Sequence, residues 1–162
     1  MSRLMIAAVI AAGVVASPLF AQAPAPPPPY GPAITFDAAK KTLAAAEAEA
    51  KKNNWPVAIA IVDSSGNLAA FSKMDNTQHG SVDIAVGKAV TANNLKRPTK
   101  ALQDAIAQGG AGLRLLAVKD ITPLEGGVPI VVDGKIIGAI GVSGVASNQD
   151  ADVAMAGAAA AK

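Results

Sequence analysis

The sequence predicts a single domain of the α/β (α+β) class, with helices packed on a mostly antiparallel sheet. The chain has 162 residues, which is enough for one domain with a real core and too few for two ordinary ones. Two pairs of short apolar runs are joined by turn sequences, which predict hairpins rather than parallel crossovers. Segments with helical periodicity flank each hairpin. The expected order of elements is therefore α-β-β-α-α-β-β-α.

The first element of the domain is a helix, expected over residues 36–53. Thr35 is a good N-cap, and Asp37 lies in the first turn, where the helix dipole favours a negative charge. The run 57–62 is continuously apolar and rich in β-branched residues, which is typical of a strand covered on both faces. A turn cluster at 63–67 then predicts a return strand over 68–74.

The middle of the chain predicts two further helices. The first is expected from Ser81, which we assign as its cap, to about Leu95. A break at Pro98 restarts a shorter helix from Thr99 to about Ala107. The glycine-rich stretch 109–112 predicts irregular structure after it.

The second hairpin is the clearest short-range signal. Strands are expected over 128–132 and 135–143, around the Asp133-Gly134 turn. Pro129 cannot donate a backbone hydrogen bond, so it predicts an edge strand or a strand start. A last helix is expected to begin with Ser147 as its cap.

Two segments precede the domain. Residues 1–21 have the pattern of a signal peptide, because Arg3 precedes an apolar run that is too short to span about 30 Å of hydrocarbon. We expect cleavage before Gln22, an exported protein in the periplasm or secreted, and no stable membrane span after cleavage. Residues 22–33 form a proline-rich linker, with six prolines in residues 23–32, which favours an extended spacer. The domain is then 34–162.

Composition excludes several function classes. The net charge is only +2, and aromatic residues make up 3% of the chain, which argues against a nucleic-acid partner. The absence of Cys excludes disulfides, zinc fingers and covalent haem attachment through thiols. The glycines around Ser143 lie inside a strand, so they fit neither a dinucleotide fingerprint nor a nucleophile elbow. Glycine in a strand more often marks the close approach of another backbone.

Three residues could carry chemistry. His79 is the only His of the chain; it could ligate haem iron or a transition metal, or be an exposed loop residue. Glu125 is followed by two glycines, so its carboxylate could approach a ligand closely or accept backbone N–H groups within its own turn. Lys88 could point into a cleft or extend its charge to water.

Several segments together have a recognisable order and spacing. The most distinctive are Thr-Pro-Leu-Glu-Gly-Gly-Val-Pro-Ile at 122–130 and Ile-Gly-Ala-Ile-Gly-Val-Ser-Gly at 137–144. Shorter matches lie at 57–63, 66–68, 73–75, 81, 88–89, 91–92, 98–99, 108–110 and 149–150. In these segments the chain resembles the GlcG/HbpS family, the haem-degrading-type domain, over residues 34–160. It is similar, too, to the C-terminal domain of some corrinoid adenosyltransferases.

The resemblance implies a three-layer α/β/α single domain that forms homo-oligomers. It also implies haem binding in some members, and haem degradation or iron handling has been ascribed to the group. The matching positions place a ligand cleft among Met74, Asp75, Ser81, Lys88, Thr91 and 125–127. For a non-covalent haem b, the candidate binding residues are His79, Met74, Lys88, Thr122 and Glu125. His79 departs from relatives, which often carry an apolar residue there.

Three hypotheses about function are therefore compatible with the sequence. The first is an exported haem-binding protein. The second is a binder of a small carboxylate, or an enzyme acting on one, with Lys88 and the helix start at Ser81 attracting the anion and Glu125 or Asp75 as acid/base. The third is a structural oligomer without chemistry. Binding is favoured over catalysis, and no catalytic residue is assigned.

Overall fold

The computed structural model describes residues 25–161, so the predicted signal peptide lies outside the described residues. A four-stranded sheet forms the centre, in the order β2-β1-β4-β3 with every neighbouring pair antiparallel. Its strands are β1 (Ala58–Asp63), β2 (Leu68–Lys73), β3 (Gly127–Val132) and β4 (Lys135–Ser143). The antiparallel sheet is confirmed, and so is Pro129 on an edge strand.

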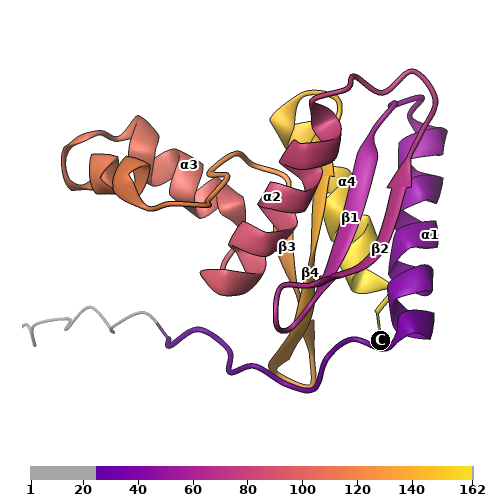
Figure 1. Ribbon diagram of the computed structural model, residues 1–162, viewed down its shortest axis with the longest axis horizontal. Helices are drawn as coiled ribbons and strands as arrows, with labels where there is room; N and C mark the ends of the chain where they lie inside the picture. Colours follow the sequence, from indigo (N-terminus) through magenta and orange to yellow (C-terminus); the bar gives the residue numbers. More distant parts are fainter. Residues whose placement is uncertain (1–24, 162) are drawn as a thin grey trace, which may run out of the picture.

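Helices cover both faces of the sheet, which gives the predicted three layers. Figure 1 shows α1 (Phe36–Lys52) and α4 (Ser147–Ala159) on one face and α2 (Ser81–Asn94) on the other. The short helix α3 (Thr99–Ala107) and the 3₁₀ helix η1 (Gly110–Ala117) project away from the sheet, and we call residues 99–124 the arm.

The two faces of the sheet bury different side chains. Ile59 and Ile61 of β1 pack in the cluster shared with α1 and α4, whereas Ala58, Ala60 and Val62 pack in the cluster shared with α2. Because alternate residues of a strand point to opposite faces, this arrangement explains why the whole β1 run is apolar.

The glycines of β4 allow α2 to approach closely. A Cβ on Gly141 would collide with the carbonyl oxygen of Ala85 and the backbone of Ala89, both in α2. A Cβ on Gly138 would collide with the carbonyl oxygen of Val62. The expectation that these strand glycines mark close backbone approach is confirmed.

The structure confirms one of the three expected helix caps and overturns the other two, together with the prediction for the glycine-rich stretch. The Thr35 hydroxyl accepts a hydrogen bond from Ala38 N at 3.2 Å, so its capping role is confirmed. The caps assigned to Ser81 and Ser147 are wrong, because Gly80 and Ala146 occupy the N-cap positions and both serines begin their helices. Irregular structure at 109–112 is wrong as well, because η1 begins at Gly110; Gly109 and Gly110 adopt positive φ and turn the chain into it.

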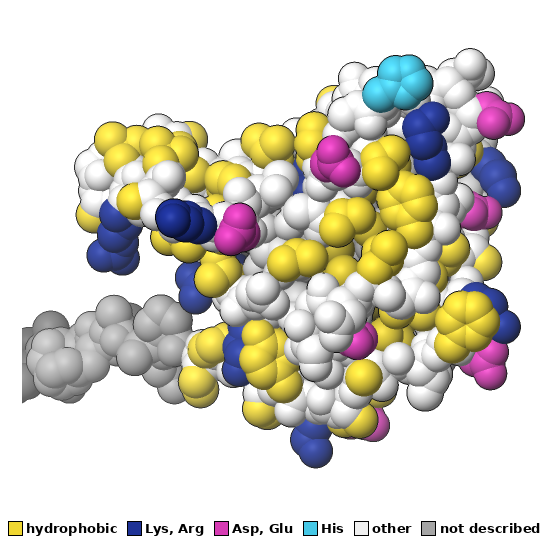
Figure 2. All heavy atoms as spheres, viewed as in Figure 1, with side chains coloured by type: hydrophobic (Ala, Val, Ile, Leu, Met, Phe, Trp, Pro, Cys, Tyr) yellow, Lys and Arg dark blue, Asp and Glu magenta, His cyan; other side chains and the backbone are white. Residues whose placement is uncertain are grey.

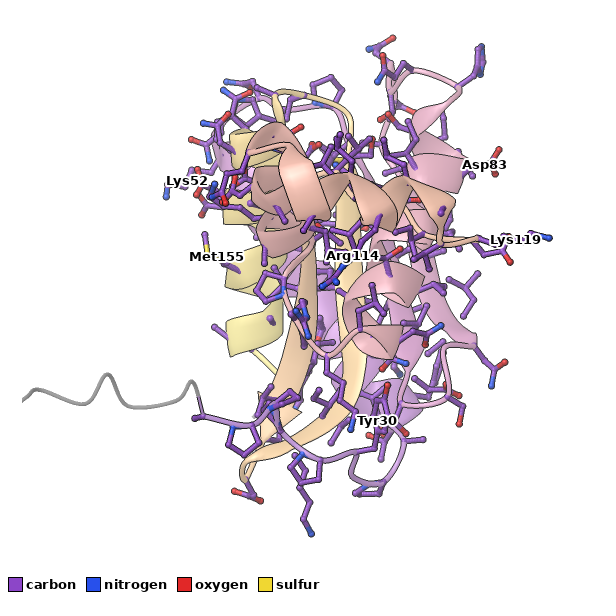
Figure 3. The ribbon with its side chains drawn as sticks, turned by 90° about the vertical axis from the view of Figure 1, so that its left-hand side faces the viewer. Tyr30, Lys52, Asp83, Arg114, Lys119 and Met155 are labelled. Carbon is purple, nitrogen blue, oxygen red and sulfur yellow. The ribbon has the colours of Figure 1, made fainter. Side chains whose placement is uncertain are left out.

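The last part of the proline-rich segment lies against the sheet. Ile136 N donates to Pro29 O at 2.9 Å, and Gly31 N donates back to Ile136 O at 2.8 Å. Proline lacks an N–H but keeps its carbonyl acceptor, so Pro29 can join this ladder. The Tyr30 hydroxyl donates to Asn93 O at 2.9 Å, and Figure 3 labels Tyr30 where this segment crosses the end of the sheet. Residues 29–31 therefore pack against β4, ahead of the predicted domain start at residue 34.

Candidate functional site

Most residues of the predicted cleft meet where β4 ends, and their centre is a buried ion pair. Lys88 Nζ of α2 donates to Asp150 Oδ2 of α4 at 2.8 Å and to Val142 O of β4 at 2.9 Å. The two side chains are 2% and 3% exposed. Lys88 thus reaches from one helical layer, past the end of the sheet, to the other. Its charge is already paired, so it neither extends to water nor offers an unpaired cation to an anion.

The two glycines after Glu125 make room for this lysine. A Cβ on Gly126 would lie 2.8 Å from Lys88 Nζ and 2.8 Å from Val142 O. A Cβ on Gly127 would collide with Lys88 O, and Gly127 N donates to the Thr99 hydroxyl at 2.8 Å. The glycine pair therefore serves packing around Lys88.

Burial dominates the electrostatics of Asp150. Removal from water raises the pKa of its carboxyl, while Lys88 and the backbone N–H groups of Val145 and Gly144 oppose that rise. Ser81 and Ser143 close the same end of the sheet with a buried hydroxyl contact of 3.2 Å. The cluster joins α2, α4 and β4 and is covered by the segment that enters β3, so its geometry is that of a structural clamp.

Residues 122–125 are hydrogen-bonded to side chains of α2 and α3, and the Glu125 carboxylate does not stabilise their turn. Thr122 N donates to the Thr91 hydroxyl at 2.7 Å, and the Thr122 side chain packs against Gly87. Glu125 N donates to Gln103 Oε1 at 2.8 Å. Within residues 25–161 no hydrogen bond reaches the Glu125 carboxylate, so the predicted self-capping of this turn is not seen. The pKa of Lys100 is raised chiefly by its hydrogen bond to Asp104, and the Glu125 charge adds to that rise.

Met74 lies apart from this cluster and lines an open cavity. The cavity has a volume of about 520 Å³ and lies beside β2 and the C-terminal end of α1. Its lining combines an aromatic ring, a thioether and charged groups: Glu47, Lys51, Asn54, Trp55, Pro56, Ser72, Lys73, Met74, Asp75 and Asn76. A volume between about 300 and 1,000 Å³ is typical of ligand and cofactor sites.

His79 is exposed on the loop before α2 and does not line this cavity. Between residues 25 and 161, no group of three or more His, Cys, Asp or Glu side chains is placed to hold a metal ion. Asp75 and Asp83, the acids that flank His79 in the sequence, therefore do not form such a group with it. In the same part of the chain, no helix is long and apolar enough to cross a membrane.

Sequence reasoning brought Lys88, Thr91, Ser81 and the 125–127 segment together correctly, but it missed two things. The partner of Lys88 is Asp150, to which the sequence pattern assigned no role in the site. The cavity residues Trp55, Lys51 and Lys73 were not predicted. Trp55 is the only Trp of the chain and directly precedes a proline after the first helix. A single large aromatic residue at such a turn is the feature of the sequence that could have pointed to this cavity.

Comparison with known proteins agrees with this architecture. The family model described as haem degrading protein HbpS-like matches residues 34–159. The chain belongs to the HbpS-like family. Protein GlcG of Escherichia coli strain K12 is 46% identical over 105 residues, which is 65% of this chain and 77% of GlcG.

Solved structures of the HbpS-like fold include two informative neighbours. A double mutant of HbpS from Streptomyces reticuli superposes with a TM-score of 0.73 at 32% identity, covering 90% of this chain and 97% of that one. The crystal structure of a PduOC–haem complex superposes with a TM-score of 0.72 at 32% identity, covering 79% of this chain and 94% of that one. The PduOC domain therefore holds haem on the fold described above.

Proposed function

We propose that this protein binds haem b non-covalently. The observation that carries the proposal is its similarity to PduOC in complex with haem, which extends over 79% of the chain at 32% identity. The HbpS-like family match over residues 34–159 supports the same role. Bound haem would supply an iron centre for ligand binding, sensing or electron transfer.

The side chains present fit a non-covalent haem. Haem iron in proteins takes His, Met, Cys or Tyr ligands. The chain has no Cys, and the Tyr30 hydroxyl is hydrogen-bonded to α2. Met74 borders an open cavity and His79 is exposed, so both remain available. Lys88 and Thr122 are engaged inside the fold, which makes them poor iron ligands.

Hemin titration of the purified protein from residue 22 onward tests this function. The expected result is a saturable, red-shifted Soret band at a fixed ratio of haem to subunit. A spectrum identical to that of hemin mixed with an unrelated protein would contradict the proposal. Thermal melts with small carboxylates in parallel would detect the competing function, because a ligand bound only by the native state raises the melting temperature.

We also propose that the arm mediates self-association. Its large apolar side chains Leu113, Leu116, Val118 and Leu124 are 49%, 66%, 46% and 43% exposed. Figure 2 shows apolar side chains gathered on this projecting part of the molecule. Contiguous exposed apolar surface is typical of protein–protein contact sites. Light scattering should show an oligomer for the natural sequence and a smaller species for Leu116→Asp; an unchanged mass would contradict this use of the arm.

Export is the remaining part of the proposal. It rests on the charge and apolar pattern of residues 1–21. Expression of the full chain in a bacterium, followed by fractionation and N-terminal sequencing, should give a periplasmic or secreted protein that begins near Gln22. An intact N-terminus in the cytoplasmic fraction would contradict it.

A further inference from the structure

We infer that the outer edge of β2 pairs with the same strand of a second copy of this chain, across a two-fold axis beside Ser72. This contact is separate from haem binding and from the arm. It joins the two sheets into one continuous antiparallel sheet.

The sheet has two outer edges, and the one formed by β3 is already closed. Val142 N donates to Gly126 O at 2.9 Å. In the register of β3 with β4, Gly127 and Pro129 therefore turn their backbone groups outward. Gly127 N donates to the Thr99 hydroxyl at 2.8 Å, and proline has no N–H. From Gly127 to Pro129, this edge offers no unbonded N–H to another strand.

The edge formed by β2 is open. Met74 N donates to Val57 O at 3.0 Å. In the register of β2 with β1, Ser72 therefore turns its backbone groups to β1, whereas Phe71 and Lys73 turn theirs outward. In the described part of the chain no hydrogen bond reaches the N–H of Phe71 or Lys73, and both residues are at least partly exposed. Such a row of unpaired groups is a template for a further strand.

A second copy of β2 complements this edge. Antiparallel pairing about Ser72 places Phe71 of each chain opposite Lys73 of the other, and each of these pairs exchanges two N–H···O bonds. Lys73 has no ion-pair partner among the described residues, so its ammonium is free to lie over the ring of the second copy's Phe71. The two Lys73 side chains are offset along the strands, so like charges do not stand directly opposite.

The same pairing covers apolar surface. The helix α2 packs over β1 and β4 and leaves β2 largely uncovered on its side of the sheet. Phe71 is therefore only half-buried, and Leu68 is 55% exposed. Figure 2 shows apolar side chains gathered over β2 and the neighbouring part of α2. A folded second copy brings the same apolar strip to the contact, which makes it continuous across the two strands.

A single introduced cysteine tests the pairing, because the chain has no Cys. The two Ser72 residues should form a non-hydrogen-bonded pair with Cα atoms about 4.5 Å apart, which a disulfide can bridge. Mild oxidation of Ser72→Cys at micromolar concentration should give a covalent dimer on non-reducing electrophoresis. Ser65→Cys, exposed in the turn between β1 and β2, is the matched control and should stay monomeric. Circular dichroism checks that both variants fold.

Light scattering on the Leu116→Asp background, which removes the proposed arm contact, gives a second measurement. Lys73→Pro deletes only an outward N–H, as Pro129 does in β3, and should convert a dimer into a monomer. Lys73→Ala keeps that N–H and is the matched control. It should remain a dimer whose affinity is about five- to thirty-fold weaker, the effect of two lost cation–π contacts.

Three outcomes would overturn this pairing. They are a Ser72→Cys protein that is not cross-linked, a dimer that Lys73→Pro leaves intact, and a Leu116→Asp protein that is already monomeric. The last would leave the β2 edge to a strand of another protein. None of them touches the proposed haem binding, which the Soret titration tests separately. An unchanged oligomer mass in Leu116→Asp would contradict the arm contact alone.

Discussion

Two Lys–carboxylate pairs in this protein have the same chemistry and opposite surroundings. Lys88 and Asp150 meet at 2.8 Å with side chains 2% and 3% exposed, whereas Lys51 and Glu47 meet at 3.3 Å with side chains 65% and 27% exposed. The carboxyl pKa values shift in opposite directions: burial raises that of Asp150, and a hydrogen bond from Ser72 lowers that of Glu47. The first pair joins three elements, and the second borders an open cavity.

The difference shows that proximity of opposite charges does not define a binding site. The Lys88 ammonium is surrounded by Asp150, the Val142 carbonyl and Gly126. The pair therefore connects α2, α4 and β4 and has a structural role. The cavity at Met74 has solvent access and one lysine without an ion-pair partner among the described residues. The family motifs around Lys88 therefore meet in a buried, paired cluster, and the ligand cleft predicted there stays a prediction.

Breaking the buried pair should have the largest effect on stability. Asp150→Asn leaves the Lys88 charge buried without its partner, which typically costs about 3–5 kcal/mol. Chemical denaturation should show that loss in the free energy of unfolding. The double variant Lys88→Met with Asp150→Leu should recover much of it, because replacing both charges by apolar groups is often close to neutral. If the single variant were as stable as the natural sequence, the pair would not be a clamp.

Filling the space beside Lys88 should have the next largest effect. Gly127→Ala puts a methyl group against Lys88 O and within 2.7 Å of the Thr99 methyl, and overpacking of this kind costs about 1–3 kcal/mol. Gly80→Ala is the matched control, because nothing lies within 4 Å of a Cβ there. Thermal unfolding of the two variants should separate them clearly. Equal melting temperatures would mean that the 126–127 segment can move away from Lys88.

Breaking the exposed pair should have a much smaller effect. Lys51→Ala removes the ion pair with Glu47 at 3.3 Å, and exposed pairs contribute about 0.2–1 kcal/mol. Denaturation in low and high salt measures this, since salt screens an exposed pair and leaves a buried one almost unaffected. A loss as large as that of Asp150→Asn would remove the contrast between the two pairs.

The pH dependence of stability should follow Glu47. Its pKa is lowered, chiefly by a hydrogen bond from Ser72, so its contribution to stability is present above its ordinary pKa and is lost as pH falls through the folded pKa. On acidification from neutral pH, the stability gap between the natural sequence and Glu47→Gln should therefore narrow, as denaturation at a series of pH values would show. A gap that widens on acidification would refute this pKa shift.

Local signals were sufficient for most of the fold. The apolar run of β1, the Asp133-Gly134 turn and Pro129 each act through the backbone conformation or hydrogen bonding of a few neighbouring residues, and each was confirmed. The failures were also local. Ser81 has the chemistry of an N-cap, but its hydroxyl accepts a hydrogen bond from Ser143 at the end of β4, so a tertiary contact outweighed a local preference.

The amino-acid sequence by itself determined the antiparallel sheet, the helices and the membership of the HbpS-like family, because hydrophobic periodicity, turn residues and motif order are carried by neighbouring residues. Only the tertiary structure decided that Lys88 and Asp150, 62 positions apart, form one buried pair, and that Trp55, Met74 and Lys73 line one cavity. These roles depend on which side chains the packed layers exclude from water. Spacing along the chain does not encode that burial, so the sequence alone could not show which lysine is buried in an ion pair and which lysines line an open cavity.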